Sequence, residues 1–320
     1  MTPEQLRVFV AVAERQHVTR AAEALNLAQS AASAAIAALE QRHGVPLFRR
    51  VGRGIELTEE GHAFLPEARA VLARIEAAEL ALAELGGLVR GTLPVMASQT
   101  VAGYWLPRHL VGFHRAYPGV AVRLSVGNTA QVASAIRGGT AEIGFVEGAL
   151  DDPELEGLTV ANDQLVLVVG PNHPWAAAAA PAAAALARAG DWVLRESGSG
   201  TRSAFEEWLR EAGQDPAVLD VALELPSNEA VRAAVEAGMG ATVISASVAA
   251  PSIEAGLLHH VPLPMPSRAF RALWHRERRR SRAAGALLDL IRTPVPGRAA
   301  GSETPAHRVT PRRAGGSGRG

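Results

Sequence analysis

The chain has 320 residues with 32 basic and 32 acidic side chains, and it contains neither cysteine nor lysine. This excludes disulfides, thiolate zinc sites, cysteine nucleophiles, Schiff bases and lysine-containing phosphate loops. The composition, 48% hydrophobic and 20% charged, is that of a globular protein, and the length predicts two or three domains. Residues 1–4 do not resemble the start of a signal peptide, and no apolar run approaches about 18 residues. We therefore expect a cytoplasmic protein with no membrane partner.

The charges are unevenly distributed along the chain. Residues 1–90 have ten arginines and eleven acids, residues 91–265 have nine and 18, and residues 266–320 have 13 and three. The three segments therefore carry net charges of −1, −9 and +10. A basic surface is typical of proteins that bind nucleic acid, so the zero average alone does not exclude such a partner.

The first 45 residues predict three helices. Residues 3–12 have apolar side chains at three- and four-residue spacings, which indicates an amphipathic helix. Thr19 is expected to cap a short helix over 20–25, and a further helix is expected over 29–42. Two helices joined by a tight turn are typical of a helix-turn-helix unit, whose second helix enters the DNA major groove.

The expected second helix has an inward stripe of Ala32, Ile36 and Leu39. Glutamine and serine on its outward face can donate to and accept from base edges. The expected DNA contacts from the two helices are Thr19, Arg20, Gln29, Ser30 and Ser33.

Residues 47–57 read as a small hairpin after the helices. It has arginines at Arg49, Arg50 and Arg53, which can contact phosphates. The order of two helices and such a wing predicts an amino-terminal, all-α winged helix-turn-helix domain that binds double-stranded DNA.

A long linker helix is expected to follow the hairpin as far as residue 85. Thr58 can cap its first turn, and Pro66 should either kink it or delay its start. An exposed apolar stripe on such a helix needs a partner, so we expect a homodimer or homotetramer. The stripe consists of Leu65, Leu72, Ile75 and Leu82.

From residue 91 the pattern changes to strands alternating with helices. Units of this length imply a mostly parallel sheet with helices on both faces. The expected strands are residues 92–97, 120–126, 141–146, 165–169, 192–195 and 241–245.

Hydroxyl-rich turns follow several of these strands. The expected turns are residues 98–100, 128–129, 197–202 and 227–228, with Glu147 at another strand end. Ligands of open sheets bind beyond the carboxyl ends of the strands, so we expect these turns to form one cleft. The small residues of 197–202 open a helix, where free amides suit an anion.

Catalytic patterns are absent from the sequence. There is no His-Glu-x-x-His metal motif, and Gly198-Ser199-Gly200 lacks the spacing of a nucleophile elbow. We therefore expect a protein that is not an enzyme and uses no metal or cofactor. A two-lobed solute-binding protein or enzyme remains the alternative.

The amino-terminal residues resemble the signature of LysR-type transcriptional regulators. The similar segments are residues 6–14, 19–25, 29–33, 39–40, 44–50 and 57–61. The chain departs from the family at Ala28, where a capping serine or threonine is common, and at Ala35 and Ala37, near which many members carry a basic residue.

The resemblance implies a two-lobed α/β effector domain similar to periplasmic binding proteins, with two crossovers between its lobes. It implies a winged domain over 1–58, a linker helix over 59–90, and an effector domain over 91–292, with lobe I at 91–161 and 266–292 and lobe II at 162–265. Residues 293–320, rich in Pro, Gly, Ser and Arg, are expected to be disordered. They are either a solvated extension or an extra DNA contact.

Within the family, the turns resemble the branch of carbon-fixation and cysteine-metabolism regulators. This resemblance implies a small, anionic effector. Arg202 would be its counter-charge or part of a surface salt bridge, and Glu147 would bind a donor group or brace the hinge. The implied effector contacts are Ser98, Gln99, Thr100, Asn128, Thr129, Ser199, Thr201, Arg202 and Ser227.

Overall fold

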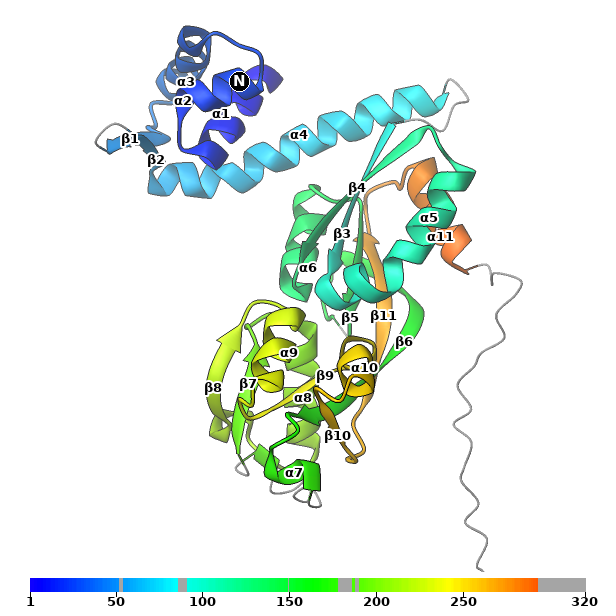
Figure 1. Cartoon of the computed structure of the whole chain (residues 1–320). Coiled ribbons are helices and arrows are strands. Elements are labelled where there is room, and N and C mark those ends of the chain that lie inside the picture. The colour runs from blue at the N-terminus through cyan, green and yellow to red at the C-terminus, as the bar shows by residue number, and fades with distance from the viewer. Residues whose placement is uncertain (52–53, 86–90, 149, 178–185, 188–189, 293–320) are drawn as a thin grey trace, which may run out of the picture.

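The computed structural model describes residues 1–51, 54–85, 91–148, 150–177, 186–187 and 190–292. It has a small helical domain, one long helix and a two-lobed α/β body (Figure 1). Within the described residues, no helix is both long and apolar enough to cross a membrane. The predicted fold class is confirmed; the tail expected over 293–320 lies outside the described residues.

The helical domain consists of α1 (Pro3–Arg15), α2 (Val18–Ala24) and α3 (Gln29–His43). Leu6 and Phe9 of α1 pack with Leu39 of α3 in one core, and Ala21 and Ala32 lie in a second. Alanine at these positions lets the helices approach closely, as the helix-turn-helix prediction requires.

The start of α2 differs from the prediction that Thr19 is its cap. His17 is the capping residue, and its Nδ1 accepts a hydrogen bond from the backbone N–H of Arg20 at 3.4 Å. Thr19 lies inside the helix and is exposed. The prediction was wrong because it considered hydroxyl caps, whereas an imidazole nitrogen also accepts from a free amide.

The amino terminus of α3 has no side-chain cap. Ala28 holds the capping position with an extended backbone, and no side chain accepts from the first turn. The departure from the family pattern at Ala28 therefore leaves the first turn of α3 without one stabilising hydrogen bond.

The wing consists of β1 (Phe48–Val51) and β2 (Gly54–Leu57), which pair antiparallel. Glu40 of α3 accepts from the backbone N–H of Leu47 at 2.7 Å and of Phe48 at 3.0 Å. These two bonds attach the wing to the second helix of the helix-turn-helix unit.

The linker helix α4 (Glu59–Leu85) begins where predicted, because Thr58 Oγ1 accepts from Gly61 N at 3.0 Å. Pro66 lies inside the helix, so it does not delay its start. Leu65 and Leu72 pack against the core of the helical domain. The predicted stripe is thus partly used within its own chain, Ile75 is half-buried, and the side chain of Leu82 lies outside the described residues.

The sheet of the α/β body has the order β4-β3-β5-β11-β6-β9-β7-β8, with β10 paired to β6. The strands are β3 (Gly91–Ser98), β4 (Val120–Gly127), β5 (Ile143–Glu147), β6 (Leu155–Val169), β7 (Asp191–Arg195), β8 (Asp220–Leu225), β9 (Ala241–Ser245), β10 (His259–Val261) and β11 (Ser267–His275).

The expectation of a mostly parallel sheet holds only at its two ends. β3 is parallel to β4 and β5, and β7 is parallel to β8 and β9. In the centre, β11 is antiparallel to β5 and β6, and β6 is antiparallel to β9. The chain leaves one lobe through β6 and returns beside it through β11, so these strands run in opposite directions.

Each lobe has its own core. Leu93, Phe113 and Phe145 belong to the core beside β3–β5, whereas Trp192 and Phe205 belong to the core beside β7–β9. The elements packed around the sheet are η1 (Val101–Trp105), α5 (Leu106–Ala116), α6 (Thr129–Gly138), α7 (Pro174–Ala177), α8 (Gly200–Glu211), η3 (Pro216–Val218), α9 (Asn228–Glu236), α10 (Ala246–Glu254) and α11 (Arg282–Arg292).

Adding the missing cap should stabilise α3. We expect Ala28→Ser to slow hydrogen exchange of the first-turn amides of α3 by an amount corresponding to about 1 kcal/mol, because the hydroxyl accepts from one of them. The matched control is Ala31→Ser, in the exposed first turn of the same helix. Equal exchange in the two variants would contradict the assignment of Ala28 as the capping position.

Candidate functional site

The expected base contacts lie on the outer face of α3. Gln29 and Ser30 are exposed and Ser33 is half-buried, and Gln29 Nε2 donates to Ser33 Oγ at 3.3 Å. Thr19 and Arg20 lie on α2 and are also exposed. The arrangement leaves these polar side chains free of the core and able to contact a ligand as large as DNA.

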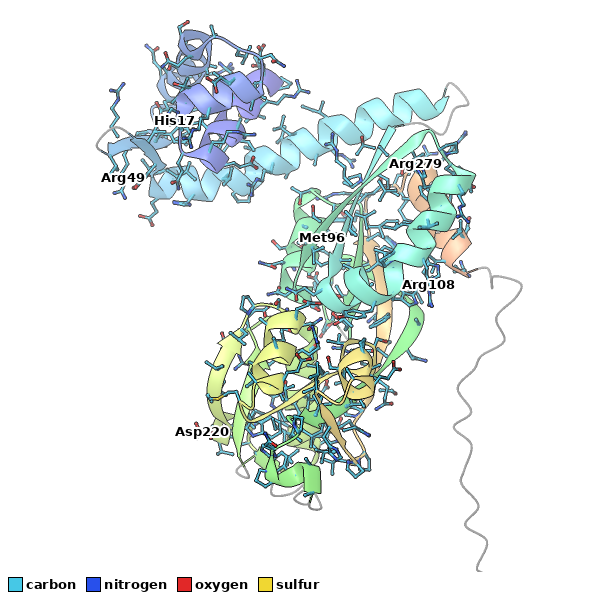
Figure 2. All side chains as sticks on the ribbon, viewed as in Figure 1. His17, Arg49, Met96, Arg108, Asp220 and Arg279 are labelled. Atoms are coloured by element: carbon cyan, nitrogen blue, oxygen red, sulfur yellow. The ribbon has the colours of Figure 1, made fainter. Side chains whose placement is uncertain are left out.

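The wing arginines differ from one another in their surroundings. Arg49 lies on the wing (Figure 2). It pairs across the hairpin with Glu56, with Nη2 3.2 Å from Oε2. Arg50 is exposed, and Arg53 lies outside the described residues. Sequence reasoning missed Glu56, although its position opposite Arg49 in a short hairpin was the signal that could have identified the pair.

Where the cleft was expected, an amide side chain bridges the two lobes. The side chain of Gln99, after β3, donates from Nε2 to the carbonyl of Pro226 at 2.7 Å and accepts from the backbone N–H of Asn228 at 3.0 Å. Asn228 Nδ2 donates to Thr100 Oγ1 at 3.1 Å. Two of the expected turns therefore meet directly.

A second bridge also joins the two lobes. Asn128, the capping residue of α6, donates from Nδ2 to Glu196 Oε1 at 3.2 Å, and Ala130 N donates to Gly198 O at 3.3 Å. Burial alone would raise the pKa of Glu196, but hydrogen bonds and the charge of Arg195 outweigh it and lower that pKa. Glu196 is thus ionised at neutral pH and holds this bridge as an acceptor.

A buried ionic cluster lies on the two strands by which the chain crosses between the lobes. Arg268 of β11 donates from Nε and Nη2 to Asp163 Oδ2 of β6 at 2.9 and 2.8 Å, and from Nη1 to Thr201 Oγ1 at 3.0 Å. Ser245 Oγ donates to Asp163 Oδ1 at 2.6 Å. Sequence reasoning missed Arg268 and Asp163. The feature of the sequence that could have identified them is a single charged residue next to the apolar residues of a strand.

Glu147 lies at the lobe I side of this cluster and is buried. Its Oε2 is 3.4 Å from Thr129 Oγ1, and its Oε1 is 3.9 Å from Arg268 Nη2. Asp163 is therefore the nearer and Glu147 the more distant of the two carboxylates beside the Arg268 guanidinium.

The remaining serines divide into two groups. Ser98 is buried, and its Oγ has no hydrogen-bond partner among the described residues; Ser199 precedes α8, is also buried and makes no capping hydrogen bond. Ser227 caps α9 by accepting from Ala230 N at 3.0 Å.

A hollow of about 350 Å³, lined in part by Gln99 and Ser227, opens beside the first bridge.

Arg202 is the expected effector residue whose charge is already compensated. Its guanidinium pairs with Glu206 at 2.8 Å and with Glu224, and it donates to the carbonyl of Arg195. Of its two predicted roles, the structure shows the salt bridge.

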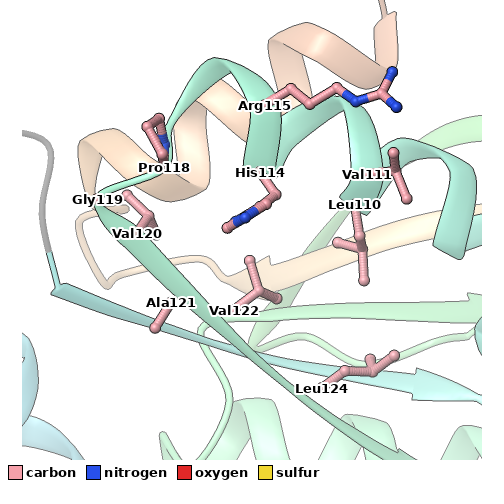
Figure 3. A pocket seen from close by; sticks show the side chains of 10 residues that line it. All are labelled: Leu110, Val111, His114, Arg115, Pro118, Gly119, Val120, Ala121, Val122 and Leu124. Atoms are coloured by element: carbon pink, nitrogen blue, oxygen red, sulfur yellow. The ribbon is translucent and has the colours of Figure 1, made fainter.

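A separate apolar groove of about 670 Å³ lies outside the cleft, between α5 and the edge strand β4 (Figure 3). Leu110, Val120, Val122 and Leu124 line it, and the neighbouring Val111 is 52% exposed.

Within the described residues, no cluster of three or more His, Asp or Glu side chains could hold a metal ion.

The close approach of the lobes depends on Gly200, the first residue of α8. A Cβ at this position would lie 2.6 Å from Thr129 Oγ1 and 2.9 Å from the backbone oxygen of Glu147. We expect Gly200→Ala to force the lobes apart, to lower the free energy of unfolding by about 1–3 kcal/mol and to increase the radius of gyration in small-angle scattering. Gly285→Ala in α11, where a Cβ meets open space, is the control. An unchanged radius in Gly200→Ala would contradict direct contact of the lobes in solution.

Two family models match the chain. One, described as the bacterial regulatory helix-turn-helix protein, lysR family, matches residues 3–62, and the LysR substrate binding domain matches residues 86–294.

Similar proteins match over most of the chain. The chain is 35% identical over 292 residues to the HTH-type transcriptional regulator YeiE of Escherichia coli K12, covering 90% of this chain and 96% of that protein. It is 33% identical over 291 residues to the RuBisCO operon transcriptional regulator of Allochromatium vinosum, covering 90% and 94%. The structure of full-length CbnR complexed with its target DNA matches at a TM-score of 0.67 and 25% identity, covering 91% of this chain and 99% of that one. The chain therefore belongs to the LysR family of transcriptional regulators, as its residues predicted, with a helix-turn-helix domain followed by a substrate-binding domain.

Proposed function

We propose that this regulator reads its operator through α3 and the wing, and that a small anionic effector between the two lobes controls it. The observation that carries this proposal is the convergence of polar turns from both lobes on one interlobe cluster, connected to a helix-turn-helix unit by α4. An effector that binds two lobe arrangements with different affinity would shift their populations.

For DNA we assign two kinds of contact. Gln29, Ser30 and Ser33 present amide and hydroxyl groups suited to base edges. Arginines and a hydroxyl on α2 and the wing suit the phosphates, which fix position without reading sequence. The assigned phosphate contacts are Thr19, Arg20, Arg49, Arg50 and Arg53. The similar protein CbnR has been solved with its target DNA, which supports this mode.

The two kinds of contact should separate in binding assays with the intergenic DNA upstream of the gene and with random DNA. We expect Arg50→Ala to weaken binding to both fragments equally and to lower the salt slope by about one, because it removes one phosphate contact. Gln29→Ala should instead reduce the preference for the upstream fragment by about 1–3 kcal/mol. If Gln29→Ala left that preference intact, the assignment of α3 to the bases would be wrong.

The hydrogen-bond donors at the proposed effector site indicate which chemical class of effector it suits. The buried hydroxyls of Ser98, Thr100 and Thr201 and the first amides of α8 offer several short-range donors, which suit a small oxyanion. Ser199, Ser227, Asn128, Thr129 and Gln99 complete the proposed lining. Glu147 would then accept from a hydroxyl or protonated oxygen of the same molecule.

A thermal-shift screen of phosphorylated sugars, nucleotides and sulfur-containing anions tests this class. An effector at 100 times its Kd should stabilise the protein by about 2.7 kcal/mol. We expect Thr100→Ala and Thr201→Ala to abolish the shift, whereas Thr159→Ala, on an exposed part of β6, should retain it. A hit whose shift survived both cleft substitutions would place the effector elsewhere.

We further propose that the protein acts by binding alone, in the cytoplasm, as a homodimer or homotetramer. The exposed apolar groove beside β4 and the 41% exposed Val71 on α4 are surfaces that a second copy could cover. The proposed units are residues 1–58, 59–90 and 91–292, with the lobes divided near residues 161 and 265.

A further inference from the structure

Helix α6 extends between the cleft and the linker helix. At its amino end, Asn128 and Ala130 donate to Glu196 and Gly198 of the other lobe. At its carboxyl end, a Cβ on Gly139 would lie 3.9 Å from the Cβ of Ala73 in α4. Figure 1 shows α6 between α4 and the second lobe. One ten-residue helix therefore contacts both the proposed effector site and the element that leads to the DNA-binding domain.

The carboxyl end of α6 is capped by an arginine from elsewhere in the chain. Arg278, in the loop after β11, donates from Nη1 to the carbonyl of Ile136 at 2.8 Å and from Nη2 to the carbonyl of Arg137 at 2.5 Å. A cation is favourable there because the last carbonyls of a helix lack intrahelical partners and form the negative end of its dipole. The arginine-rich segment 276–282 thus has a structural contact, separate from any contact with DNA.

The same guanidinium lies beside the linker helix. A Cβ on Gly139 would be 2.9 Å from Arg278 Nη1, so Arg278 fills the corner between α6 and Ala73 of α4. Burial, and next the positive charge of Arg74 on α4, lower the pKa of Arg278, whereas Glu154 raises it. The junction therefore brings two like charges together, and the α6 carbonyls offset their repulsion.

Helix α6 is firmly seated on its own lobe. Val132, Ala133 and Ile136 are buried, and a Cβ on Gly144 of β5 would lie 2.5 Å from Val132 Cγ1. These contacts anchor α6 to its lobe between Asn128 at one end and the carbonyls of Ile136 and Arg137 at the other, so one helix places both ends.

We propose that Arg278 is a positioning residue that fixes the direction of α4 relative to lobe I, so that the interlobe contact of Asn128 at the other end of α6 influences that direction. This regulation rests on the proposed function, because it connects the proposed effector site to the DNA-binding domain. Its test, however, requires neither DNA nor effector.

The absence of cysteine allows two spin labels to be placed without background. Ala63→Cys on α4 and Thr159→Cys on β6 are exposed sites, and labelled chains are diluted with unlabelled ones to suppress distances between subunits. We expect one narrow distance in the parent and loss of that narrow distance in Arg278→Met. Arg279→Met, the exposed neighbour of equal charge, is the matched control and should behave as the parent.

Two further variants distinguish positioning from a general loss of structure. Arg278→Lys should retain the narrow distance, because an ammonium also donates to the α6 carbonyls. Arg74→Glu lies on the exposed side of α4, outside the lobe I core, and should shift the distance only when Arg278 is present. Thermal unfolding of each variant checks that the lobes remain folded.

The coupling between the ends of α6 is measured by a double-mutant cycle. Asn128→Ala should shift the distance in the parent and add no change in Arg278→Met. A narrow distance that persisted in Arg278→Met, or an equal effect of Asn128→Ala in both backgrounds, would overturn the inference. Either result would leave operator binding untouched, whereas loss of operator binding by the parent would contradict only the proposed function.

Discussion

The two lobes of the α/β body depend on one ion pair at the place where the chain crosses between them. Asp163 of β6 and Arg268 of β11 are direct cross-strand partners in the register of these antiparallel strands, and both side chains are 3% exposed. Removing one partner of such a buried pair leaves an uncompensated charge, typically at a cost of about 3–5 kcal/mol. Because Thr201 of α8 and Ser245 of β9 also bond to this pair, the crossover and the cleft share a single polar centre.

The structure shows that part of the basic segment of the chain is bonded within the protein. The protein has no net charge, yet it belongs to a DNA-binding family. Long-range attraction to DNA is weak for such a protein, so the proposed operator contacts rest on a few arginines held at short range. Arg278 and Arg280 of the basic segment are engaged within the protein, with the α6 carbonyls and the ring of Trp274. A local excess of arginine is therefore not by itself a DNA-binding surface.

Much of the fold could be predicted where each element is stabilised locally. The inward stripe of α3 and the Thr58 cap of α4 were predicted correctly because spacing and caps act within a few residues. The first half of β6 was missed because its residues pair with β11, a strand about a hundred residues later in the chain. The cap of α2 was predicted at Thr19, whereas it is His17. Residue spacing does not show whether a hydroxyl or an imidazole nitrogen lies in the position to accept from the first free amide.

The amino-acid sequence by itself determined the order of the domains, the helix-turn-helix unit, the family, and the polar turns that meet in the cleft. These follow from periodicity and from residue chemistry along a short stretch of chain. Only the tertiary structure decided that Arg202 is engaged in salt bridges, that Arg268 and Asp163 form a buried ion pair between the crossover strands, and that Arg278 donates to the last carbonyls of α6. Asp163 and Arg268 are 105 residues apart in the chain, and Ile136 and Arg278 are 142 residues apart, whereas an electrostatic contact depends on distance in space.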